Sequence, residues 1–146
     1  MKRKKRSLKQ MSKVDLDGLI ADYDKQRDAF LKTMKKNFGG YVAELIKDDV
    51  VAIRWTQYSP HFNDGDPCVF SVYEADVKFK DTEEDAGDHE DGFENEYSRE
   101  GKSKTFDKIN AVIQKIPTEA MLDMFGDGIQ VTVTADGIET EEYEHD

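Results

Sequence analysis

The sequence has 146 residues, enough for one domain with a single core. Hydrophobic residues make up 37% and charged residues 36%, and no apolar run approaches the roughly 18 residues that a membrane-spanning helix needs. The basic start lacks the apolar segment of a secretory signal peptide, so we expect a cytoplasmic protein that does not enter a membrane. The single cysteine cannot form an internal disulfide, and together with only three histidines it argues against a structural zinc site.

Charge is distributed unevenly along the chain, whose net charge is −11. The first ten residues carry six positive charges and no negative ones, which leaves 15 basic and 32 acidic residues, a net charge of −17, in the remainder. Residues 1–12 are predicted to form a flexible basic arm, and Met11 would also serve as an alternative start. Such an arm is either a solvated terminus or a segment that contacts phosphates or an acidic surface.

From Asp15 onward, apolar residues recur at steps of three and four, the spacing of an amphipathic helix. Asp15 is a suitable N-cap, and Gly39-Gly40 is predicted to end or kink the helix. We expect the apolar stripe to pack on the core rather than to act as an interaction face. Its members are Leu16, Leu19, Ile20, Tyr23, Phe30, Met34 and Phe38.

Two segments rich in β-branched and aromatic residues, 50–58 and 68–79, are predicted to pair as a β-hairpin. The sequence Asn63-Asp64-Gly65-Asp66 between them is a strong turn signal, because glycine accepts positive φ and Asn or Asp side chains bond to their own backbone. Trp55 and Cys68 are expected to face the core from the paired strands.

A long acidic segment follows the hairpin. Residues 81–100 contain ten acidic residues and one basic residue, with few apolar anchors to offset the entropy cost of ordering. We therefore predict a mobile acidic loop over 81–104.

The remaining residues predict two helices and two strands. Residues 105–125 have helical spacing that Pro117 interrupts, residues 129–134 alternate as a strand, and residues 138–146 return as a last strand after a turn at Asp136-Gly137. The pattern indicates an α+β fold with a small, mostly antiparallel sheet of two hairpins, packed with the N-terminal and central helices. We expect residues 13–146 to form a single domain.

The hairpin turn also invites metal and catalytic interpretations. Oxygen ligands on a glycine-bearing turn are typical of calcium or magnesium sites, but position twelve of an EF-hand loop is Ala75 if counted from Asp64 and Val77 if counted from Asp66. A small metal-dependent enzyme is an alternative, with a Cys–His pair beside the turn. It would use His61, Asp64, Asp66 and Cys68. We favour a protein without a catalytic residue, metal or cofactor, since no third orienting group can be identified.

Nucleic-acid binding is a second alternative, because aromatic rings beside an arginine can stack on bases. Trp55, Tyr58 and Phe62 lie on or near the hairpin, but Arg54 is almost alone there as a positive charge. The phosphate contacts would have to come from the basic arm. The arm residues in question are Lys2, Arg3, Lys4, Lys5 and Arg6.

The preferred interpretation is an acidic surface that binds a basic partner. In an extended chain Glu139 and Glu141 project to one side, and Glu142 and Glu144 to the other, with alternate residues roughly 6.6 Å apart. Carboxylates at this interval can compete for surfaces that normally bind nucleic acid. The predicted partner-binding residues are Tyr58, His61, Phe62, Asp64, Asp66, Glu139, Glu141, Glu142 and Glu144.

The run W-T-Q-Y-x-P-x-F-N-D-G-D-P-C at 55–68 and D-G-I-x-x-E-E-Y-E-H-D at 136–146 resemble a family of small uncharacterised proteins of tailed phages and bacteria. The resemblance covers about two thirds of the chain and implies a small intracellular protein, without implying any activity, cofactor or site residue. Combined with the charge pattern, it predicts a non-enzymatic, phage-type accessory protein. Such a protein would bind a host or phage macromolecule and inhibit a nucleic-acid-handling or defence factor in the host cytoplasm.

Overall fold

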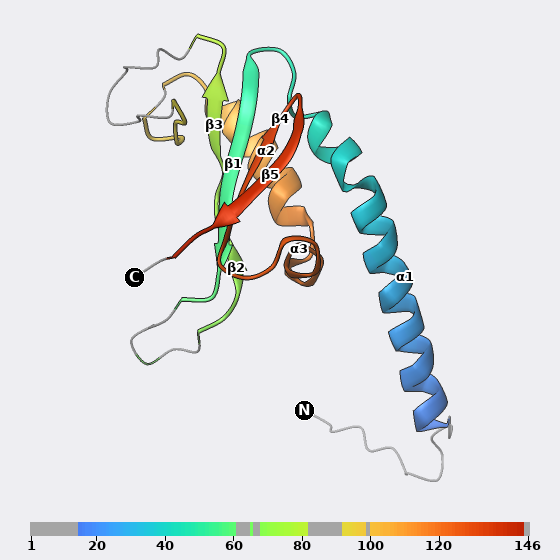
Figure 1. Cartoon of the computed structure of the whole chain (residues 1–146). Helices are drawn as coiled ribbons and strands as arrows, with labels where there is room; N and C mark the ends of the chain where they lie inside the picture. Colours follow the sequence, from blue (N-terminus) through green and yellow to red (C-terminus); the bar gives the residue numbers. More distant parts are fainter. Residues whose placement is uncertain (1–14, 61–64, 66–67, 82–91, 99, 145–146) are drawn as a thin grey trace, which may run out of the picture. The chain divides into compact units, whose positions relative to one another are not determined.

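The computed structural model describes residues 15–60, 65, 68–81, 92–98 and 100–144. The chain divides into two compact units, Met1–Thr33 and Met34–Asp146. The predicted α+β class is confirmed. The elements in chain order (Figure 1) are α1 (Leu16–Ala43), β1 (Val50–Tyr58), β2 (Ser71–Val72), β3 (Asp76–Phe79), α2 (Ser103–Lys115), α3 (Thr118–Phe125), β4 (Ile129–Thr134) and β5 (Gly137–Glu142).

The five strands form one antiparallel sheet in the order β2-β1-β4-β5, and β3 also pairs with β1. The predicted first hairpin is confirmed, with its second arm divided into β2 and β3. The predicted second hairpin is also confirmed as β4 and β5, although its last strand ends at Glu142. β1 pairs with β2 and β3 along one side and with β4 along the other, so it contacts three of the other four strands, and we call it the central strand.

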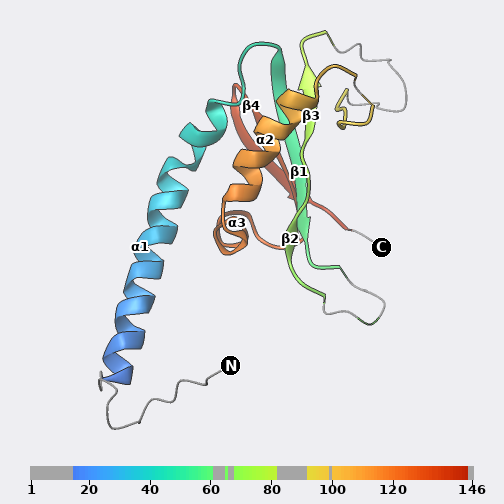
Figure 2. The same cartoon turned by 180° about the vertical axis from the view of Figure 1, so that it is seen from behind.

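The helices α2 and α3 cover one face of the sheet. The strands lie toward the viewer in Figure 1, and α2 and α3 lie toward the viewer in Figure 2. Both helices follow from the sequence, because Pro117 separates them and their apolar spacing directs Phe106, Ile109 and Ile113 into the core. Strand residues such as Ile53 and Val77 meet them from the sheet, and both side chains are fully buried.

The central strand is held to α3 by Gln57, a fully buried polar residue. Its Nε2 donates hydrogen bonds to the carbonyl oxygens of Met121 (3.0 Å) and Gly126 (2.8 Å), and its Oε1 accepts one from Nε1 of Trp55 (3.1 Å). Met121 lies within α3, and Gly126 directly follows its last residue, where a carbonyl lacks a partner within the helix. Gln57 therefore provides hydrogen-bond partners for two carbonyls at α3 and for the indole N–H of Trp55.

The end of β1 is held in a similar way. The main-chain N–H of Ser59 donates to one carboxylate oxygen of Asp127 (2.9 Å), and its hydroxyl donates to the other (2.8 Å). These bonds fix the exit of β1 against the turn that leads from α3 into β4. Trp55, Gln57 and Ser59, three members of the distinctive run at 55–68, are thus structural.

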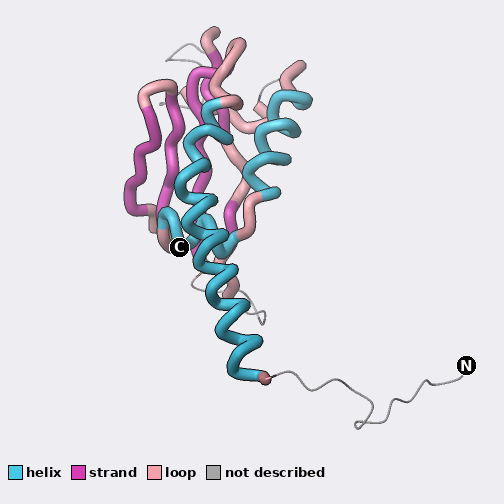
Figure 3. The backbone as a smooth tube through the Cα atoms, turned by 90° about the vertical axis from the view of Figure 1, so that its right-hand side faces the viewer, coloured by secondary structure: helices cyan, strands magenta, loops and turns pink. Residues whose placement is uncertain are grey.

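Helix α1 corrects two expectations. It continues through Gly39-Gly40 to Ala43 as one helix (Figure 3), because burial of Phe38 and Val42 in the second unit offsets a cost of about 1 kcal/mol per glycine. The apolar stripe was expected to pack on the core, but only its last member, Phe38, is buried. The earlier members Leu16, Leu19, Ile20, Tyr23 and Phe30 are 43–65% exposed.

Part of the predicted acidic loop has defined contacts. Glu94 and Val77 exchange main-chain hydrogen bonds in both directions (2.9 Å each), and Phe93 is buried. Asn95 accepts main-chain hydrogen bonds from Tyr97 and Ser98 at its side-chain oxygen, which forms a tight turn. Residues 92–98 of the predicted acidic loop thus have defined contacts, while residues 82–91 lie outside the described part.

Among the described residues, no helix combines the length and the apolar character required to cross a membrane.

Candidate binding face

The face of the sheet opposite α2 and α3 carries a separate set of side chains. Trp55 packs edge-on against Phe38 and Phe125, and Ile53 and Gln57 are buried with it, so the odd-numbered residues from Ile53 to Gln57 point toward the helices. The even-numbered residues Arg54, Thr56 and Tyr58 therefore point the other way, because successive strand residues alternate between faces. We call this second surface the open face.

Three tyrosines meet at one end of the open face. The rings of Tyr58 and Tyr73 are stacked with centroids 4.3 Å apart, and the ring of Tyr143 lies 5.5 Å from that of Tyr58. Tyr58 comes from β1, Tyr73 from the link between β2 and β3, and Tyr143 from the residue after β5. All three side chains are half-buried, so each keeps part of an aromatic surface accessible. We call these three residues the tyrosine cluster.

The surroundings of Tyr58 in the cluster favour the neutral form of its side chain. Burial raises the pKa of Tyr58 above its ordinary value of 10.0, and the neighbouring Tyr73 raises the pKa further through a side-chain hydrogen bond and its charge. Tyr58 therefore remains a neutral, amphipathic ring at physiological pH, suited to stacking and hydrogen bonding.

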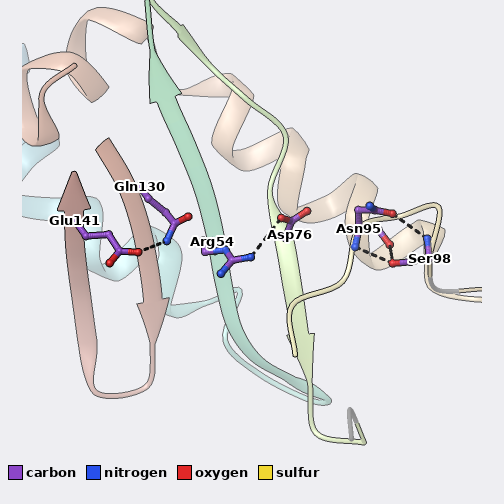
Figure 4. Close-up of polar contacts among 6 residues, drawn as sticks. All are labelled: Arg54, Asp76, Asn95, Ser98, Gln130 and Glu141. Atoms are coloured by element: carbon purple, nitrogen blue, oxygen red, sulfur yellow. Dashed lines mark hydrogen bonds and ion pairs between the residues drawn. The ribbon is translucent and has the colours of Figure 1, made fainter. Parts of the chain in front are cut away.

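Beside the cluster lies the acidic strand β5. All six residues of β5 are exposed, and among the described residues β5 pairs with β4 alone. Residues 126–144 contain six carboxylates and no lysine or arginine. On β4, Thr132 is paired with Arg54 of β1 and Gln130 with Thr56. On β5, Glu139 is paired with Thr132 and Glu141 with Gln130, so both glutamates share the open face. Gln130 donates a hydrogen bond of 2.5 Å to Glu141 (Figure 4).

Polar and aromatic contacts occupy the part of the open face that lies next to β3. Arg54 and Asp76 form an ion pair across β1 and β3 with a 3.9 Å separation (Figure 4), and the Arg54 guanidinium lies 4.2 Å from the ring centroid of Phe93. The positive charge of Arg54 is therefore engaged within the protein. The acidic edge strand β5 lies across the sheet from this pair and has no basic residue in its own hairpin.

The structure brings together some of the predicted site residues. Glu139 and Glu141 share the open face with Tyr58, Glu142 is exposed at the end of β5, and Glu144 is exposed two residues later. His61, Phe62, Asp64 and Asp66 lie outside the described residues, as do Lys2, Arg3, Lys4, Lys5 and Arg6 of the basic arm.

Of two residues from the alternative sites, one lies where it was expected and the other does not. Trp55 is 1% exposed and cannot stack on a base, although its position in the core confirms the expected orientation. Cys68 is exposed rather than buried. Within the described ranges, no three His, Cys, Asp or Glu side chains converge as a metal site would require.

Sequence reasoning missed two members of the tyrosine cluster. Tyr73 alternates with Ser71, which is paired with Tyr58, so strand alternation alone would have placed Tyr73 on the same face. Tyr143 follows Glu141 by two residues and could have been found in the same way. The cluster was missed because its three rings come from segments far apart in the sequence.

Comparison of the chain with known proteins found no matching family model, no similar curated protein and no similar solved structure.

Proposed function

We propose that this chain is a non-enzymatic accessory protein that binds a basic segment of a protein partner along β5. The observation that carries the proposal is the exposed β5 strand, which combines an accessible edge with carboxylates on the open face. The tyrosine cluster lies at the end of the same surface and offers aromatic rings to the partner.

The proposed mode of binding is the addition of a strand to β5. An edge strand presents main-chain N–H and C=O groups to an extended peptide, which gives affinity with little dependence on the peptide's sequence. Glu139 and Glu141 lie two residues apart, roughly 6.6 Å along the strand, the same spacing as alternate side chains of an added strand. Lysine or arginine at alternate positions of the partner would therefore face both carboxylates.

The tyrosine cluster would add selectivity to the charge attraction. Tyr58 and Tyr73 form a stacked, half-buried aromatic pair. An arginine guanidinium can stack on such a surface, and this contact is worth about 0.5–1 kcal/mol at an exposed site. The arrangement favours a partner segment that contains arginine near one end.

The resemblance of 55–68 and 136–146 to small phage and bacterial proteins suggests the setting of this interaction. We propose a phage-type protein of the host cytoplasm that occupies a basic surface of a nucleic-acid-handling or defence factor. An acidic strand is suited to that role, because a surface that binds phosphates also attracts an ordered row of carboxylates.

Affinity capture from host lysate tests the proposal with two variants of equal charge. The first changes Glu139, Glu141, Glu142 and Glu144 to Gln, and the control changes the exposed Glu44, Glu100, Asp107 and Asp123 to their amides. We expect the first variant to lose the captured protein and the control to retain it. Equal retention by both variants would contradict the proposal.

Deletion of residues 1–10 distinguishes the nucleic-acid alternative. If the proposal holds, the shortened chain keeps its protein partner. A gel shift with nucleic acid at about 150 mM salt that disappears on deletion of the arm would instead favour the alternative.

A further inference from the structure

The exposed apolar stripe of α1 suggests a second surface, separate from the open face. Leu16, Leu19, Ile20, Tyr23 and Phe30 are 65%, 55%, 48%, 64% and 43% exposed. A stripe of large apolar side chains with this exposure along one helix is a common mark of a protein–protein contact.

The spacing of the stripe is that of a coiled coil. Starting at Leu16, the next positions follow at steps of four, three, four and three residues, which is the alternation of the a and d positions of a heptad. These positions are Leu16, Ile20, Tyr23, Arg27 and Phe30. We call the line of these five positions along the helix the seam. A seam with this period packs against another helix with the same period, and a second copy of α1 meets that requirement.

Charge determines the direction of such a pair. Residues 15–24 contain four aspartates and no basic residue, whereas residues 25–36 contain five basic residues and one acidic residue. Two parallel copies would place like charges side by side. Two antiparallel copies place the acidic half of each helix beside the basic half of the other, and they also align the helix dipoles favourably.

We infer that α1 mediates self-association as an antiparallel helix pair between two copies of this chain. A register centred near residue 25 places Ile20 opposite Phe30 and Tyr23 opposite Arg27 of the second copy. The only charged seam residue in this stretch, Arg27, then meets an aromatic ring, a contact that tolerates a cation. One charged seam position of this kind fixes register at some cost in stability.

Sedimentation analysis of the full chain tests the inference. The monomer mass is 16.7 kDa. We expect the weight-average mass to rise toward twice that value between about 1 µM and about 300 µM protein, a range that reports dissociation constants in the micromolar region. We also expect higher salt to weaken the association, because it screens the complementary halves. A monomer mass across the whole range would overturn the inference.

Matched variants test whether the stripe is the contact. Ile20→Gln with Phe30→Gln changes two seam positions, and Ala21→Gln with Ala29→Gln makes the same kind of change at exposed positions on the other side of the helix. We expect the first pair to weaken association at least a hundredfold and the second to change it less than threefold. Equal effects would overturn the assignment. Tryptophan emission, reporting on buried Trp55, checks that both variants remain folded.

Cysteine cross-linking tests the direction. In a Cys68→Ser background, Ile20→Cys and Phe30→Cys chains are oxidised separately and as a mixture. Antiparallel pairing predicts a disulfide-linked dimer in the mixture and little in either chain alone. Efficient linkage of the Ile20→Cys chain with itself would show parallel pairing and overturn the antiparallel assignment.

Discussion

The side-chain amide of Gln57 on β1 donates a hydrogen bond to the carbonyl oxygen of Met121 on α3, 64 residues later in the chain. The same amide donates to the carbonyl of Gly126, and its oxygen accepts from the indole of Trp55. A single polar side chain thus joins the central strand, the end of a helix and the largest core residue. Buried polar groups that are fully satisfied in this way favour one arrangement of the elements around them.

Gln57→Leu should therefore destabilise the fold. It leaves the Trp55 N–H and two carbonyls without their partner, and we expect the free energy of unfolding to fall by about 2–4 kcal/mol. Urea denaturation followed by tryptophan emission measures the change. The control is Gln130→Leu on the same sheet, whose side-chain bond to Glu141 is exposed and whose loss should cost less than about 0.5 kcal/mol. Similar losses for both variants would contradict this role of Gln57.

The aromatic cluster around Trp55 should contribute a comparable amount. Phe38 is 2% exposed and lies edge-on to Trp55 and Phe125, with centroids 6.2 Å and 5.3 Å away. Phe38→Ala should lower the free energy of unfolding by about 3–5 kcal/mol, because it leaves a cavity among the rings. It should also shift the Trp55 emission to longer wavelength. Tyr97→Ala, at a residue 87% exposed, should leave both observables nearly unchanged.

The contact between Ser59 and Asp127 can be isolated with a double-mutant cycle. Ser59→Ala removes the hydroxyl bond and Asp127→Ala removes both bonds. Because the pair is exposed, we expect a coupling free energy of about 0.5–1 kcal/mol for the side-chain bond. Thermal unfolding of the four proteins gives this value, and a coupling near zero would show that the hydroxyl bond does not stabilise the exit of β1.

The tyrosine cluster predicts a dependence of stability on alkaline pH. Burial and Tyr73 raise the pKa of Tyr58 in the folded state, so the folded protein holds the phenolic proton more tightly than the unfolded chain does. This contribution is fully present below pH of about 10, the unfolded pKa of tyrosine, and is lost as pH rises through the higher folded pKa. The stability difference between the wild type and Tyr58→Phe should therefore decline above that pH.

Urea denaturation between pH 8 and pH of about 11.5 measures this difference, and comparison with Tyr97→Phe removes the contribution of other titrating groups. A difference between the wild type and Tyr58→Phe that stays constant across this range would contradict the environment assigned to Tyr58.

The sequence predicted the elements whose local signals agree with their burial. The turn signals and alternation around 50–79 and 129–142 identified both hairpins, and Pro117 separated α2 from α3. The same signals failed where a tertiary contact outweighed local propensity. Gly39-Gly40 does not end α1, because Phe38 and Val42 on either side are buried in the second unit.

The candidate site was only partly predictable. Strand alternation placed Glu139 and Glu141 on one side, and the register confirms that placement. The stacking of Tyr58 on Tyr73 depends on how β2 and β3 divide the second arm of the hairpin, which no local pattern indicates. The role of Gln57 was hidden for a related reason, since its partners are main-chain carbonyls more than 60 residues away.

The most direct test of the proposed function is an NMR titration of the full chain with a nine-residue peptide of alternating threonine and arginine or lysine. We expect the amide shift changes to concentrate at β5 and the tyrosine cluster. We also expect the peptide to bind at least about tenfold more weakly to the variant in which Glu139, Glu141, Glu142 and Glu144 are changed to Gln, because the peptide recognises these carboxylates. Its affinity for the control variant, with amides at positions 44, 100, 107 and 123, should be unchanged. Shift changes on α2 and α3, or equal weakening in both variants, would show that total charge rather than β5 attracts basic partners.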